Sequence, residues 1–201
     1  MMGGGDYMNI GGIAPNMNPY LGTAKSANKT QSGSFQNAMN NVSSTGKTIQ
    51  LHGSVDCDGN KVIGAWGDAV AGTSTTVYKP ADFDPNEPKY LMRIWDDDNN
   101  LLEEREVDIS ELDIKNCDTF DLYAYACHLS DSKEYPDALN KFLMMPTQNN
   151  NSFSADYDIS NLYEKKNWFK VIKDFMDMQY GAGNIQGYLD FKKFYDFLLE
   201  K

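Results

Sequence analysis

Alternation of apolar and polar residues marks the middle of the chain. Around Asp58-Gly59, a dipeptide typical of hairpin turns, apolar residues occur at every second position, as they do in a strand with one buried face. Three further runs continue the pattern, at residues 75–78, 90–95 and 101–107. The charged residues 103–106 indicate a wet face or an edge position for the last run. The pattern predicts a small antiparallel sheet of hairpins.

A helical period replaces the alternation after the strands. Asp118 is a suitable N-cap and Asp121 follows three residues later, so that both carboxylates suit the positive end of a helix dipole. Apolar residues then repeat every three or four positions through residues 120–129. A shorter helix is expected within residues 136–143, where a proline precedes further apolar positions.

The last part of the chain predicts a helical hairpin. Apolar residues repeat with helical spacing in residues 168–176 and again in residues 191–198. Residues 181–184 separate the two segments, with glycines suited to a C-cap and an asparagine suited to an N-cap. Together these elements predict an α+β fold, in which a small antiparallel sheet packs with helices and a C-terminal helical hairpin.

The first 48 residues show neither period. They are rich in Gly, Asn, Ser and Thr, and such a segment buries too little apolar surface to offset the entropy of ordering it. We therefore expect three regions. Residues 1–48 form a disordered or low-complexity leader, and residues 49–145 form an acidic, strand-rich body. Residues 146–201 form a linker and the helical hairpin, which we expect to pack on the body as one domain.

The leader also bears on where the protein acts. It has neither the basic start and apolar run of a secretory signal nor an apolar stretch of about 18 residues, so we expect a cytoplasmic protein without membrane insertion. Residues 34–40 resemble the start of small flagellar rod proteins. That resemblance leaves export by a signal-peptide-independent, flagellar-type route as the alternative.

The charge of the chain narrows the choice of partners. The formal net charge is −11, from 18 basic and 29 acidic residues. Residues 51–145 hold 20 of the acidic residues and only eight of the basic ones. Nucleic acids and anionic membranes would be repelled by such a chain. We therefore expect a protein partner, no nucleic acid and no membrane.

The sequence contains few candidate metal-binding or catalytic residues. The acidic loops at Asp56 and Asp96 lack the glycine and glutamate of a calcium-binding EF-hand loop, and Cys117 and Cys127 lack the close spacing of zinc ligands. His128 follows Cys127, but adjacent helical residues point in different directions, so buried structural cysteines are expected. No catalytic motif is present, so we expect no metal or cofactor and assign no catalytic residue.

Aromatic and acidic residues of the body suggest one binding alternative. Trp66, Trp95, Asp96 and Asp98 combine aromatic faces with carboxylates, a composition that suits a sugar ligand. Paired carboxylates about 5–10 Å apart would further suit a glycoside hydrolase. These four residues are the candidate ligand-binding residues of the sequence.

Three segments resemble uncharacterised proteins of clostridial Gram-positive bacteria: residues 75–85, 89–100 and 116–127. The resemblance implies a bacterial protein and carries no activity or site residue. Two functional hypotheses follow from the sequence as a whole. The favoured one is a non-catalytic interaction or structural protein; the alternative is a carboxylate-based hydrolase or carbohydrate-binding protein with an acidic, aromatic-lined cleft.

Overall fold

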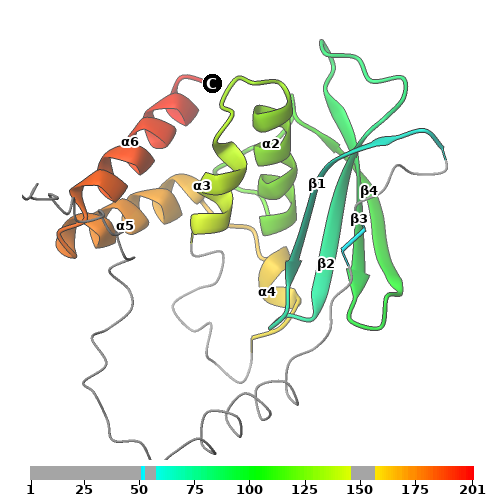
Figure 1. Cartoon of the computed structure of the whole chain (residues 1–201), viewed down its shortest axis with the longest axis horizontal. Coiled ribbons are helices and arrows are strands. Elements are labelled where there is room, and N and C mark those ends of the chain that lie inside the picture. Colours follow the sequence, from blue (N-terminus) through cyan, green and yellow to red (C-terminus); the bar gives the residue numbers. More distant parts are fainter. Residues whose placement is uncertain (1–50, 53–57, 146–156) are drawn as a thin grey trace, which may run out of the picture. The chain divides into compact units, whose positions relative to one another are not determined.

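The computed structural model describes residues 51–52, 58–145 and 157–201. Every described residue belongs to one compact unit. The predicted leader, most of the first hairpin up to residue 57 and the predicted linker at 147–154 lie outside the described residues. The described part has the predicted α+β fold (Figure 1).

An antiparallel meander forms the sheet. Its strands are β1 (Lys61–Asp68), β2 (Thr73–Lys79), β3 (Lys89–Asp96) and β4 (Leu101–Asp108). In the described residues they pair in the order β1-β2-β3-β4, each antiparallel to the next. Each strand contains one of the alternating runs of the sequence, and β4, with its charged run, lies at an edge as predicted.

Helices follow the sheet along the chain. They are α2 (Thr119–Asp131), α3 (Ala138–Met144), α4 (Ser160–Tyr163), α5 (Trp168–Gly181) and α6 (Ile185–Leu199). The Asp118 carboxylate caps α2 by accepting a hydrogen bond from the Asp121 N–H, and the Asn184 side chain caps α6 through the N–H of Gly187. All except the four-residue α4 were predicted, because α4 is too short to show a helical period.

The helices lie on one side of the sheet: α2 packs against the strands, and α5 and α6 lie beyond α2 and α3 (Figure 1). Side chains of that face, such as Met92 and Ile94, are fully buried. The indole of Trp66 packs edge-on against Phe142 of α3, with ring centroids 5.3 Å apart. The main hydrophobic core therefore lies between the sheet and these helices.

The C-terminal helical hairpin is attached to the body by aromatic side chains. Trp168, at the start of α5, is fully buried and its indole N–H donates to the carbonyl of Cys117 at 3.0 Å. Tyr135 packs against Phe194 and Phe197 of α6, with centroids 5.0 and 5.1 Å away. Among the described residues, no helix is both long and apolar enough to cross a membrane.

Close contact between α2 and β1 depends on a glycine. A Cβ atom at Gly64 would lie 2.4 Å from Sγ of Cys127 and 2.7 Å from the hydroxyl oxygen of Tyr123. Both distances are far below van der Waals contact, so a side chain here requires Cys127 and Tyr123 to shift or the helix and the strand to move apart. Gly64 thus sets how closely α2 approaches the sheet.

We predict that Gly64→Ala lowers the free energy of unfolding by about 1–3 kcal/mol, because the added methyl group overpacks the helix–sheet contact. Gly181→Ala is the matched control, since a Cβ at Gly181 meets no atom within 4 Å. That variant should be neutral or slightly stabilising. Urea unfolding followed by circular dichroism measures both. Equal stability of the Gly64→Ala variant and the parent chain would contradict the close contact.

Candidate binding pocket

An open pocket of about 430 Å³ lies where the helical hairpin meets the body. Residues 109–110 and 112–115, which follow β4, line it together with parts of α2, α5 and α6. Tyr125 and Phe169 contribute aromatic surface. The aliphatic wall consists of Ile109, Leu112, Ile114, Leu129, Leu198 and Leu199. The pocket exposes about as much polar as apolar surface, and its volume lies within the range of small-molecule sites.

A chain of polar contacts follows one side of the pocket. The hydroxyl of Tyr90 on β3 lies 3.0 Å from Nδ1 of His128 on α2. Nε2 of the same imidazole lies 3.5 Å from a carboxylate oxygen of Glu134. The ammonium of Lys201 donates a hydrogen bond to that carboxylate. Both nitrogens of His128 therefore face a polar partner, and the chain links the sheet, α2 and the segment after α6.

The protonation states of this chain follow from its surroundings. Burial lowers the pKa of His128, although the nearby carboxylates of Glu134 and Asp131 act in the opposite direction. The hydrogen bond from Lys201 lowers the pKa of Glu134. Near neutral pH the pocket therefore holds a neutral imidazole beside an ionised carboxylate that is paired with an ammonium.

We predict that protein stability falls as the pH is lowered through the unfolded-state pKa of His128, about 6.5. The unfolded chain binds the proton more tightly than the folded chain, so the loss begins near that value and ends below the folded pKa. Unfolding free energies between about pH 7.5 and about pH 5.5 should decline less steeply in His128→Asn than in the parent chain. An NMR titration that gives His128 a folded pKa above 6.5 would contradict this account.

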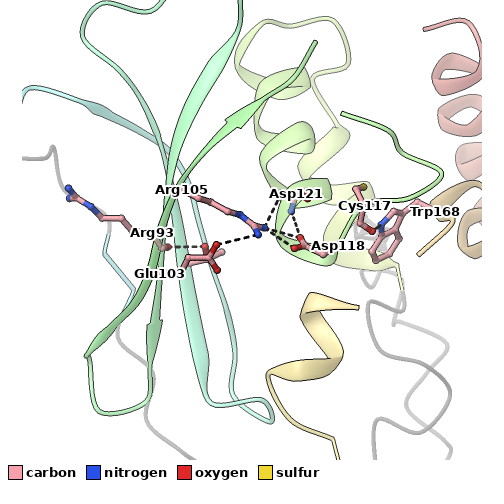
Figure 2. Close-up of polar contacts among 8 residues, drawn as sticks. Arg93, Glu103, Arg105, Cys117, Asp118, Asp121 and Trp168 are labelled. Carbon is pink, nitrogen blue, oxygen red and sulfur yellow. Dashed lines mark hydrogen bonds and ion pairs between the residues drawn. The ribbon is translucent and has the colours of Figure 1, made fainter. Parts of the chain in front are cut away.

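An ion pair between the sheet and α2 positions the helix that carries these pocket residues (Figure 2). Arg105 of β4 points toward the helices, and its Nη2 lies 3.0 and 2.9 Å from the two carboxylate oxygens of Asp118. The same nitrogen lies 2.9 Å from Asp121, and Nη1 lies 3.5 Å from Glu103. Because Asp118 also caps α2, one carboxylate joins the helix start to the strand.

We predict that Arg105→Met lowers the free energy of unfolding by about 2–4 kcal/mol, since it leaves a buried carboxylate without its cation. The Asp118 side chain is only 7% exposed. Arg93→Met is the control. Arg93 is likewise an arginine on a strand that pairs with a carboxylate, but the side chain of its partner Glu104 is 45% exposed. That variant should cost less than about 1 kcal/mol. Equal losses in the two variants would contradict the special role of Arg105.

The residues proposed from the sequence do not share one site. Trp66 lies on the helical face of the sheet, and its cross-strand partner Thr75 pairs in turn with Ile94. Trp95 is the next residue along β3 and points to the opposite face, where its ring stacks on His52 with centroids 3.9 Å apart. Trp66 and Trp95 therefore cannot line one cleft.

The two proposed aspartates lie in and beside the turn between β3 and β4. A carboxylate oxygen of Asp96 accepts a hydrogen bond from the backbone N–H of Asn100 at 2.8 Å, so this side chain stabilises the turn. Asp98 is exposed in the same turn. Both aspartates therefore lie close in sequence to Trp95, whereas Trp66 lies on β1. None of the four residues lines the pocket at the hairpin.

Both described cysteines are buried and free, as the sequence predicted. Burial raises the pKa of Cys117 to about 12 and that of Cys127 to about 12, so both stay protonated thiols near neutral pH. Cys127 faces Gly64 of β1, whereas His128 contacts Tyr90. In the part of the chain that the structure describes, no three His, Cys, Asp or Glu residues are arranged to hold a metal ion.

A second, acidic pocket of about 420 Å³ adjoins the first, and the two share Leu112 and Asp113. Its other carboxylates come from Glu106, Asp108, Glu111 and Asp121, and no aromatic residue lines it. Lys165 also lines this pocket. The pocket lacks the aromatic wall that the sequence-based sugar hypothesis requires.

Sequence reasoning missed most residues of the hairpin pocket. His128 stood out only as the neighbour of a cysteine, and Glu134 and Lys201 are 67 positions apart. No local spacing links such residues, so only the fold brings them together. Comparison of the chain with protein-family models, with curated proteins and with solved structures gave no match.

Proposed function

We propose that this chain is a non-catalytic binding protein that holds a small, mainly apolar ligand in the pocket between the body and the helical hairpin. One observation carries the proposal: the exposed side chain of Leu199 and the half-buried side chains of Leu112, Ile114 and Phe169 line a pocket beside the paired groups of His128, Glu134 and Lys201. A protein partner, bacterial origin and the cytoplasmic location stay predictions from the sequence.

The apolar wall supports binding because it offers surface that a ligand would remove from water. Leu199 of α6 lines the pocket and is 57% exposed. Leu112 and Ile114 beside it are half-buried. Burial of such surface contributes roughly 25 cal/mol per Å², so a ligand that covers these side chains gains affinity without a charged contact.

The same pocket bears on the hydrolase alternative, because it contains Asp113 and Glu134 together with Tyr125 and Phe169. Glycoside hydrolysis needs a carboxylic acid whose pKa is raised toward the working pH. Glu134 has the opposite property, since its hydrogen bond from Lys201 lowers its pKa. These carboxylates and aromatic rings therefore support ligand binding better than hydrolysis.

We predict that the neutral fluorophore N-phenylnaphthylamine binds to one saturable site and that Leu199→Asp weakens this binding about fivefold to tenfold. The reason is that the new carboxylate must give up part of its hydration when the apolar probe enters the pocket. Fluorescence titration measures the dissociation constant.

Leu189→Asp is the matched control. Leu189 is also a leucine of α6, it is 44% exposed, and it does not line the pocket. The control should bind the probe within about twofold of the parent chain, and thermal unfolding should show both variants folded. Absence of saturable binding, or equal weakening by the two variants, would overturn the proposed function.

A further inference from the structure

We propose that the ligand is a small anionic amphiphile, in which an apolar ring system or chain carries one carboxylate or sulfonate that binds to Lys115. This assignment rests on the proposed binding function and names the chemical class of its ligand. It follows from the one pocket cation that has no carboxylate partner among the described residues.

Lys115 is an exposed residue whose ammonium lies over the Phe169 ring of the pocket. The ammonium lies 5.9 Å from the centroid of the Phe169 ring, a distance at which a cation is attracted by an aromatic face. In the described part of the chain no carboxylate lies within 4.0 Å of this ammonium, whereas Lys201 at the other side of the pocket pairs with Glu134. Lys115 is thus a charge at the pocket wall whose counterion the described residues do not provide.

The loop that carries Lys115 is fixed by its own hydrogen bonds. A carboxylate oxygen of Asp113 accepts from the backbone N–H of Lys115 at 2.9 Å, and the carbonyl of Asp113 accepts from the N–H of Asn116 at 2.8 Å. The Asp113 carboxylate is therefore engaged by the backbone of its own loop. This arrangement fixes the backbone that carries the exposed Lys115, while part of the negative charge of Asp113 is balanced locally.

The pairing of Glu134 disfavours a cationic ligand at that side of the pocket. A cationic ligand would compete with Lys201 and with the imidazole of His128 for the carboxylate of Glu134. An anionic group on Lys115 breaks no ion pair of the described residues. The apolar body would then contact Phe169 and Leu112, which line the same pocket.

Two probes that share one ring system test this assignment. Anilinonaphthalenesulfonate carries a permanent negative charge, and N-phenylnaphthylamine carries none. We expect Lys115→Met to weaken binding of the sulfonate about threefold to fivefold, as for loss of a partly exposed ion pair. Binding of the neutral probe should stay within about twofold, because methionine keeps an apolar stem beside the ring. Added salt should weaken only the sulfonate.

Lys193→Met provides the matched control for charge. Lys193 is exposed on α6, and it does not line the pocket. This variant removes the same unit of charge and should leave the affinity for both probes unchanged. Thermal unfolding of both variants checks that each remains folded.

The outcomes separate the two proposals. Suppose that the neutral probe binds and Leu199→Asp weakens its binding, but Lys115→Met leaves the affinity for the sulfonate unchanged. The anion assignment is then wrong and the proposed function stands. Equal weakening by Lys193→Met would likewise overturn the role of Lys115, because it would reflect net charge alone. Failure of both probes to bind would overturn the proposed function together with this inference.

Discussion

The ion pair between Arg105 and Asp118 is the contact on which the arrangement of this fold depends. Arg105 shares the helical face of the sheet with fully buried Met92, its cross-strand partner. A charge in that position needs a partner, since desolvation of an unpaired ion costs several kcal/mol. Asp118 supplies it and at the same time caps α2. The pair therefore fixes where the helix begins relative to β4.

The position of the pocket follows from that constraint. The helix α2 begins at the ion pair and passes Gly64 of β1 at close range, and its last turn places His128 and Leu129 at the pocket. The hairpin then closes the other side, because Trp168 is buried against the segment before α2. The pocket is thus a junction between two packed parts, where apolar surface of both remains open to solvent.

The elements of the fold were predictable because their patterns are local. Alternation identified the strands, and the cap at Asp118 identified the start of α2. It was harder to predict which side chains share a face of the sheet, since that depends on the register between strands. Trp66 and Trp95 lie on opposite faces. The charged run of β4 predicts a wet face or an edge. The strand is an edge strand, yet Arg105 within it points to the helices.

The pocket itself could not be predicted from the sequence. Its lining extends from Ile109 to Lys201 and comes from segments with no shared motif. Lys115 looks in the sequence like an ordinary exposed lysine of a loop. Its significance arises only from the ring of Phe169 and from the pairing of Glu134 with Lys201. Sites assembled from distant segments leave no periodic or spaced signal that local reasoning can detect.

The most direct test of the central claim is where a bound apolar molecule contacts the protein. Intermolecular NOEs between N-phenylnaphthylamine and the methyl groups of isotopically labelled protein give this location. The account predicts NOEs to Leu112, Ile114 and Leu198, which line the pocket. NOEs confined to Met178 and Leu189, which are exposed elsewhere on α5 and α6, would contradict it.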